Sequence, residues 1–144
     1  MTTNPSMPAS QRVVQICLFL VAAIAILGGA LQMYLGQPDT SPRLDNVHRF
    51  MAGVYFSTGL INFWAAMTIR RQGTLVYLLA LGVLLAGVGR LVSISHVGLP
   101  EPAALWLGYL IPELLLPVVI AVAHTATTRN ASQPDSVGAG HAGA

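Results

Sequence analysis

The sequence has very few charged residues, no lysine and a single cysteine. Only 8% of its 144 residues are charged, whereas 54% are hydrophobic, and the mean hydropathy is +0.66. This balance excludes an ordinary soluble domain, in which about a quarter of the residues are charged. The formal charge of +2 comes from seven scattered arginines, so we expect no nucleic-acid partner. Cys17 has no second cysteine with which to form a disulfide, and we expect it to pack as a small hydrophobic residue.

Motifs for catalysis are also missing. The sequence has no histidine cluster that could hold iron, no serine in the setting of a nucleophile and no cysteine pair. We therefore expect no cofactor and no metal site. Acid and base chemistry would have to come from Glu113 with His48 or His96, so an enzyme is the least favoured class of function.

Long apolar runs are what the sequence does contain. A helix needs about 20 mostly apolar residues to cross a bilayer core about 30 Å thick. Four such runs follow one another, at residues 13–35, 47–69, 74–95 and 103–125. They predict an all-α fold, an integral membrane antiparallel four-helix bundle. The first run is too long for a signal-peptide core and three more follow it, so we interpret it as a retained span. Residues 1–12 and 126–144 have little to bury and are expected to be disordered.

The arginines near the ends of these spans predict the orientation of the chain. One side of the membrane would carry Arg12, Arg70, Arg71 and Arg129. The other side would carry only Arg43 and Arg49. Because positive charge is enriched in cytoplasmic loops, we expect a protein of the cytoplasmic membrane with both termini in the cytoplasm.

Two charged residues lie inside predicted spans, where each costs about 3 kcal/mol on insertion. Arg90 lies in the third span and Glu113 in the fourth. Because a helical Cα–Cβ bond tilts toward the helix N-terminus, their side chains converge in depth. A short link joins the two helices, so we expect an ion pair inside the bundle. The alternative is that Arg90 extends to the outer headgroups instead.

Residues recurring at spacings of three and four predict which faces of the last two spans lie inside the bundle. In the third span this stripe is small and polar, which favours close helix approach. It contains Gly82, Ala86, Gly89, Arg90 and Ser93. The stripe of the fourth span contains Trp106, Tyr109, Glu113, Pro117, Ile120 and His124. Almost nothing separates the second and third spans, so we also expect these two to form a tight hairpin.

Two interpretations of the buried charges remain open. Arg90 and Glu113 can simply neutralise each other and fix the helix register, or they can line a polar pocket in the outer half of the bundle. That pocket would be formed by Arg90, Glu113, Arg49, Asp45, His48, Ser93 and Tyr109. Capping of the second span and an i, i+4 pair could equally explain Asp45 and Arg49.

Several short segments, taken in their order along the chain, resemble a family of small bacterial four-helix membrane proteins, domain-of-unknown-function family 4345. The matching segments are Asp45-Asn46 with Arg49-Phe50, Ala52 to Tyr55, Gly59 to Ala66, Gly89-Arg90 with Ser93, Gly98-Leu99-Pro100, and Glu113. The resemblance covers about residues 13–125 and implies an antiparallel four-helix bundle without implying any activity.

The leading hypothesis is a non-enzymatic membrane protein. It would be an accessory subunit of a larger membrane complex, or it would bind a membrane lipid or another small hydrophobic molecule. The alternative is a small proton-coupled transporter that works as a homo-oligomer, with Glu113 as the titrating group.

Overall fold

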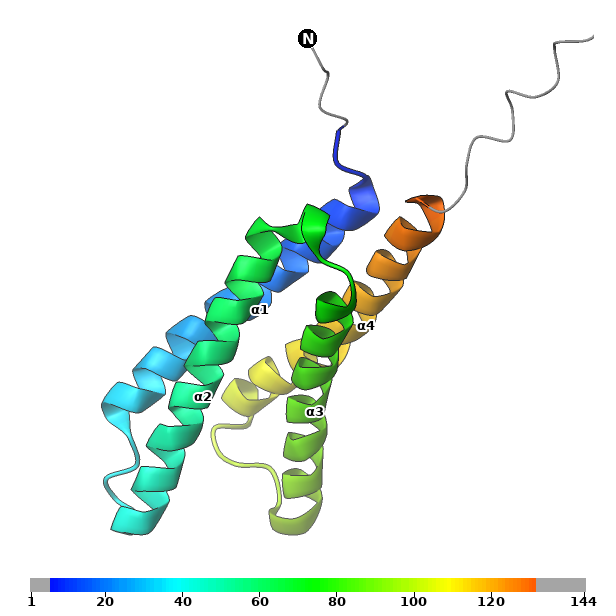
Figure 1. Ribbon diagram of the computed structural model, residues 1–144. Helices are drawn as coiled ribbons and strands as arrows, with labels where there is room; N and C mark the ends of the chain where they lie inside the picture. Colours follow the sequence, from blue (N-terminus) through cyan, green and yellow to red (C-terminus); the bar gives the residue numbers. More distant parts are fainter. Residues whose placement is uncertain (1–5, 132–144) are drawn as a thin grey trace, which may run out of the picture.

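The protein consists of four long α-helices. The computed structural model describes residues 6–131, and this part of the chain contains no β-strand. The helices are α1 (Ala9–Leu35), α2 (Pro42–Met67), α3 (Thr74–Val97) and α4 (Ala103–Ala131), and a short 3₁₀ helix, η1 (Ile69–Arg71), joins α2 to α3 (Figure 1). Each of the four is long and apolar enough to cross a membrane, so the chain is a multi-pass membrane protein, as predicted.

All four helices are longer than the apolar runs that predicted them. α1 begins at Ala9 and α4 continues to Ala131, so residues 9–12 and 126–131 are helical. The expectations for residues 1–5 and 132–144 lie outside the described residues. α2 begins five residues early, at Pro42, because the Ser41 hydroxyl accepts a hydrogen bond from the amide of Leu44 at 3.3 Å. Ser41, and not Asp45, is therefore the N-cap of α2.

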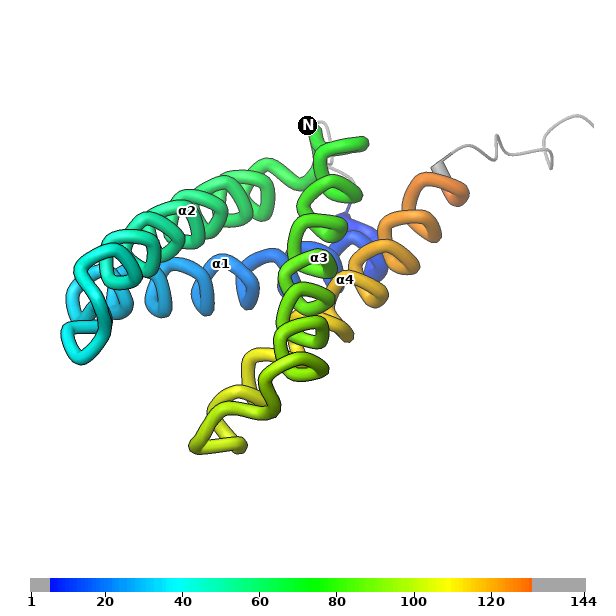
Figure 2. The backbone as a smooth tube through the Cα atoms, turned by 90° about the horizontal axis from the view of Figure 1, so that it is seen from below, coloured from blue at the N-terminus to red at the C-terminus, as the bar shows by residue number. Residues whose placement is uncertain are grey.

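The helices pair as two hairpins, α1 with α2 and α3 with α4. Consecutive helices alternate in direction, so η1 and both ends of the described chain lie at one end of the molecule, which we call the terminal end (Figure 1). The α1–α2 and α3–α4 loops lie at the opposite end, the loop end. Seen from the loop end, the two hairpins diverge from each other (Figure 2).

Contact between the hairpins comes from α1 and α4. α2 and α3 barely touch, so the predicted tight contact between them is wrong. The short connection brings together only the end of α2 and the start of α3, and η1 then turns α3 away from its predecessor. A short link limits the distance between two helix ends, but it does not fix the angle between the helices.

The apolar core lies in the half of the molecule toward the terminal end. Its members are Val14, Cys17, Leu18, Ala65, Ala66, Ile69, Val76, Ala80 and Ile120. Because lipid is as apolar as these side chains, close packing rather than transfer out of water holds them together. Hydrogen bonds reinforce the same end: Gln15 Nε2 donates to the carbonyl of Ala66 at 2.9 Å, and the hydroxyls of Ser10 and Thr127 lie 2.7 Å apart.

Two glycines allow α1 and α2 to approach closely. A Cβ atom on Gly29 would lie 2.7 Å from the backbone nitrogen of Phe56, and one on Gly59 would lie 2.9 Å from that of Ile26. No side chain fits at such distances unless the backbone moves. Small residues at a helix crossing are the usual means of close packing in membranes, and here they fix the first hairpin.

Candidate functional site

An ion pair joins α3 to α4 in the middle of the second hairpin. Arg90 Nε donates a hydrogen bond to Glu113 Oε2 at 2.6 Å, so the predicted ion pair is confirmed. Glu113 is buried, with 6% of its surface exposed, whereas 29% of the Arg90 side chain is exposed. Arg90 therefore does not extend away to the headgroups and leave Glu113 behind.

Two aromatic rings also contact the Arg90 guanidinium. Its Cζ lies 5.8 Å from the ring centroid of Trp106 and 5.5 Å from that of Tyr109. Both rings come from the α4 turns that precede Glu113, at helical spacings of four and seven residues. The positive charge is thus surrounded by one carboxylate and two π-faces, which attract a cation more strongly where water is scarce.

Gly87 allows α3 and α4 to meet beside this pair. A Cβ atom there would lie 2.9 Å from Leu114 Cδ2 and 3.2 Å from Glu113 Cβ. The close helix approach predicted along the stripe of α3 is absent at Gly82 and Gly89, because a Cβ atom at either would meet nothing within 4 Å in the described part of the chain. Gly82 nevertheless faces the interior of the bundle, since it lines the cavity described below. A pattern of small residues shows where two helices could approach closely. In α3 the glycine at which they do so is Gly87, which lies between Gly82 and Gly89.

The stripe predicted on α4 is confirmed over its second half. Glu113, Pro117, Ile120 and His124 are all buried, and α4 stays helical through both of its internal prolines. His124 Nε2 lies 3.1 Å from the carbonyl oxygen of Gly73, and its ring packs edge-on against Tyr77 with centroids 4.8 Å apart. His124 therefore belongs to the terminal end of the molecule, away from the ion pair.

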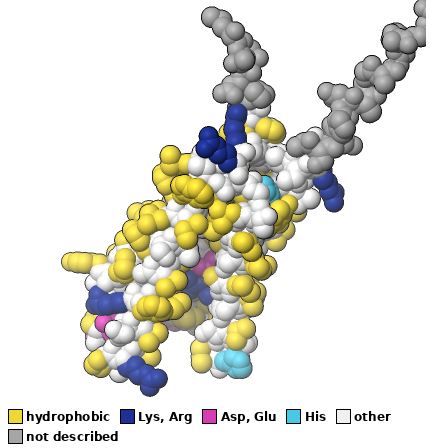
Figure 3. Space-filling view, in the orientation of Figure 1, with side chains coloured by type: hydrophobic (Ala, Val, Ile, Leu, Met, Phe, Trp, Pro, Cys, Tyr) yellow, Lys and Arg dark blue, Asp and Glu magenta, His cyan; other side chains and the backbone are white. Residues whose placement is uncertain are grey.

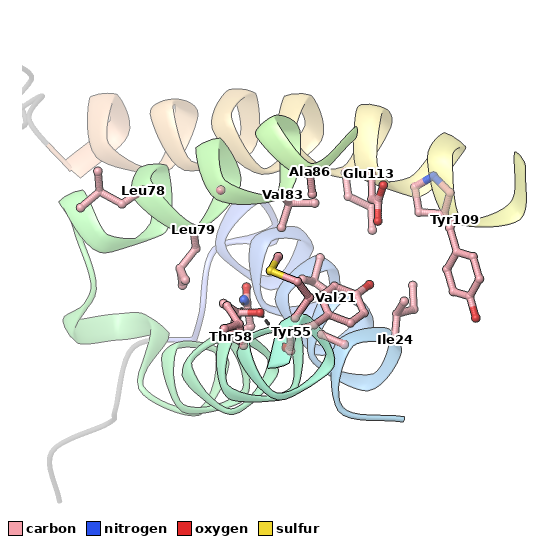
Figure 4. A pocket seen from close by; sticks show the side chains of 17 residues that line it. Val21, Ile24, Tyr55, Thr58, Leu78, Leu79, Val83, Ala86, Tyr109 and Glu113 are labelled. Carbon is pink, nitrogen blue, oxygen red and sulfur yellow. Dashed lines mark hydrogen bonds between the residues drawn. The ribbon is translucent and has the colours of Figure 1, made fainter. Parts of the chain in front are cut away.

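A cavity of about 370 Å³ lies between the two hairpins. It is lined from all four helices by Val21, Ile24, Ala25, Met51, Val54, Tyr55, Thr58, Asn62, Leu78, Leu79, Gly82, Val83, Ala86, Tyr109, Pro112, Glu113 and Leu116. Most of these side chains are apolar. The carboxylate of Glu113 points from α4 into the space, and Tyr55 projects into it from α2 (Figure 4).

The polar part of the lining comes from α2 and α4. Tyr55, Thr58 and Asn62 follow one face of α2, and Glu113 lies opposite Tyr55 on α4 (Figure 4). The Thr58 hydroxyl donates to the carbonyl of Tyr55 at 2.7 Å. The sequence did not predict these three as site residues, although their spacing of three and four residues marks one helical face.

Three of the residues expected in the pocket lie instead at the tip of the first hairpin. Asp45, His48 and Arg49 belong to the first two turns of α2, and none of them lines the cavity. Arg49 Nε donates to Asp45 Oδ2 at 2.9 Å, and its guanidinium also donates to the carbonyls of Met33 and Tyr34 at the end of α1. The Asp45–Arg49 pair therefore ties α2 to α1.

The loop at this tip has a backbone shape that fits the ion pair. Gly36 adopts a positive φ of 63°, and a Cβ atom there would collide with the Arg49 guanidinium and with the Asp45 carboxylate. These contacts explain why glycine follows α1.

Of the other residues expected in the pocket, one lines the cavity and one does not. Tyr109 lines the cavity, whereas Ser93 is exposed and lies outside the lining. Among residues 6–131, no group of three or more His, Cys, Asp or Glu side chains lies close enough together to hold a metal ion. The site therefore combines an apolar cavity with one ion pair, two tyrosines, a threonine and an asparagine.

Comparison with known proteins places the chain in a family. No curated protein and no solved structure matches it. A family model described as a domain of unknown function, DUF4345, matches residues 13–124. The match covers most of the chain and includes every residue that lines the cavity. The chain therefore belongs to the DUF4345 family.

Proposed function

We propose that this protein is a non-catalytic membrane protein that binds a lipid chain or another small hydrophobic molecule between its two hairpins. The observation that carries this proposal is the cavity of about 370 Å³, which all four membrane-spanning helices line. Binding sites for small molecules typically measure about 300–1,000 Å³ and are mostly apolar, with a few convergent polar groups. This cavity has that size and that composition.

The arrangement of the helices supports entry of the ligand from the bilayer. α2 and α3 both line the cavity but barely touch each other, and a hollow lies between them on the face seen in Figure 3. Acidic and basic side chains are visible within that hollow. A molecule dissolved in the bilayer reaches the cavity sideways through this gap, and the ion pair orients its polar group.

Filling the cavity tests this function. Gly82 lines the cavity, and nothing lies within 4 Å of where its Cβ would be, so Gly82→Leu is designed to extend a side chain into the space. The matched control is Gly108→Leu. Gly108 also has nothing within 4 Å, but it lies outside the lining, on the face of α4 that exposes Leu105 and Ile111.

The measurement is native mass spectrometry of gently extracted protein, followed by analysis of the organic extract. We expect a hydrophobic molecule to be retained by the wild type and by Gly108→Leu, and to be lost from Gly82→Leu. Equal retention by both variants, or no retained molecule in the wild type, would contradict the proposed function.

We further propose that the protein lies in the cytoplasmic membrane with its terminal end in the cytoplasm. Apart from Arg90 in the middle of the second hairpin, the arginine side chains lie toward the two ends of the molecule, with mostly apolar side chains between them (Figure 3). The terminal end carries Arg12, Arg70, Arg71 and Arg129. The loop end carries Arg43 and Arg49. The excess at the terminal end supports this orientation.

Single cysteines test the orientation. In a Cys17→Ser background, Asp39→Cys places a thiol in the exposed α1–α2 loop and Asn130→Cys places one at the exposed end of α4. An impermeant thiol reagent added to intact cells should label the first and spare the second. The reverse pattern would invert the proposed topology.

A further inference from the structure

Two buried oxygen atoms among the residues that line the cavity accept no hydrogen bond from the described protein. They are Glu113 Oε1 and Asn62 Oδ1, and their residues are 6% and 2% exposed. Leaving a buried acceptor unpaired destabilises the protein, and the cost is greater if the acceptor is charged. Two such atoms in the lining of one cavity are therefore a chemical signature of what the cavity receives.

The identity of the asparagine atom follows from its neighbour. Asn62 Nδ2 donates to the carbonyl of Thr58 at 2.9 Å, and a carbonyl can only accept. The amide nitrogen must therefore face Thr58, which leaves the oxygen as the atom without a partner. In Glu113 the other oxygen, Oε2, is occupied by Arg90, and the carboxylate of such a pair is an acceptor at Oε1 as well. Each of these two oxygen atoms can therefore accept a hydrogen bond from a donor on the ligand.

The two atoms lie at different depths in the cavity. Tyr55 is at about the level of Glu113, because the two side chains lie opposite each other across the cavity (Figure 4). Asn62 lies seven residues further along α2, on the same face and about 10 Å closer to the terminal end. Apolar side chains such as Leu79 and Val83 line the stretch of cavity contributed by α3.

We propose that the ligand is a neutral molecule with an apolar middle and a hydrogen-bond donor, such as a hydroxyl, at each end. One donor meets Glu113 Oε1 and the other meets Asn62 Oδ1. This inference rests on the proposed function and adds the chemical class of the ligand. An anionic head is disfavoured, because the charge of Arg90 is already neutralised by Glu113 and the remaining buried atoms are acceptors that would repel it.

Four linear probes of equal chain length test the class: octanediol with a hydroxyl at each end, octanol, octyl methyl ether and octanoate. Binding to the full chain in lipid nanodiscs is measured by titration calorimetry. The same titration of Gly82→Leu gives the heat of probe partition into the bilayer, which is then subtracted. We expect octanol to bind about tenfold more tightly than the ether, because a hydrogen bond to a charged acceptor is lost in the ether. The diol should gain a further factor of about five from the neutral acceptor.

Asn62→Leu separates the two ends of the ligand. Leucine has a similar volume and removes the buried acceptor, so the diol should lose its advantage over octanol while octanol keeps its advantage over the ether. An unchanged unfolding midpoint establishes that the variant is folded. The ranking of the four probes on the wild type decides the question independently of this variant.

The outcomes separate the two proposals. Equal affinity for octanol and its ether, or tighter binding of octanoate than of octanol, overturns the donor-bearing ligand while the cavity remains a binding site. A diol advantage that persists in Asn62→Leu overturns the role of the second acceptor. If no probe binds the wild type better than Gly82→Leu, the proposed function fails together with this inference.

Discussion

The terminal half and the loop half of this molecule are held together by different means. At the terminal end, apolar residues of all four helices and of η1 pack into one core, and side-chain hydrogen bonds such as Gln15 to Ala66 reinforce it. Toward the loop end the hairpins separate, and each is closed by its own ion pair, Asp45–Arg49 in the first and Arg90–Glu113 in the second. The same chain thus contains a packed half and an open half.

This difference indicates how four helices can surround a cavity without losing their fold. Close packing in the terminal half supplies contacts between the two hairpins. In the loop half the hairpins can therefore remain separated from each other around the cavity. The ion pair of the second hairpin lies beside this cavity, which Glu113 lines. If this division is correct, variants of the ion pair should loosen the open half, and variants of the glycine crossing should loosen the first hairpin.

The largest effect is expected when one member of the buried pair is removed. Glu113→Gln leaves the Arg90 guanidinium without its carboxylate, and breaking a buried pair costs about 3–5 kcal/mol. Because 29% of the Arg90 side chain is exposed, we expect the low end, about 3 kcal/mol. Chemical unfolding in detergent measures the loss, and hydrogen exchange should rise first in the loop half of α3 and α4.

A double variant controls for this loss. Arg90→Leu with Glu113→Leu removes both desolvated charges together and should recover most of the stability. If the effects of the two single variants simply add, the residues are not energetic partners, and the loop half is held by something other than the pair.

The next largest effect concerns the glycine crossing of the first hairpin. Gly29→Ala places a Cβ atom 2.7 Å from the backbone nitrogen of Phe56 and 2.9 Å from the carbonyl oxygen of Ala52, so α1 and α2 must move apart. Overpacking of this kind costs about 1–3 kcal/mol, measured by unfolding in detergent. Gly82→Ala is the matched control, because its Cβ enters open space and alanine favours a helix by up to about 1 kcal/mol. Equal stability of the two variants would show that the crossing is not tightly packed.

The parts of this structure that follow from local physical chemistry could be predicted from the sequence. The length of the apolar runs predicts the four helices. The cost of burying a charge, together with the tilt of helical side chains, predicts the contact between Arg90 and Glu113. Both arguments need only one helix, or two helices joined by a short loop.

The arrangement of the two hairpins could not be predicted in this way. It depends on which small residues meet a partner. The spacing pattern selected Gly82 and Gly89 on α3, whereas Gly87 is the one of these three glycines that meets α4 closely. The cavity is a consequence of that arrangement. For this reason Tyr55 and Asn62 were missed as lining residues, and the Asp45–Arg49 pair was assigned to the wrong part of the molecule.

The smallest expected effect is at the tip of the first hairpin. Asp45 Oδ1 accepts from the amide of Gln37 and Oδ2 accepts from Arg49. An asparagine side chain has only one acceptor oxygen, so Asp45→Asn must give up one of these contacts. We expect faster hydrogen exchange at the Gln37 amide, with exchange in the terminal core unchanged, because the pair is solvent-exposed and such pairs contribute little to global stability.

Asp39→Asn, in the same exposed loop, is the matched control and should leave the Gln37 amide unaffected. The retained hydrophobic molecule gives this variant its second readout. Asp45 does not line the cavity, so Asp45→Asn should retain the molecule as the wild type does. Loss of the molecule from Asp45→Asn but not from Asp39→Asn would mean that the tip and the cavity act together. The contrast between an ion pair that only ties helices together in the first hairpin and one that faces the cavity in the second would then no longer hold.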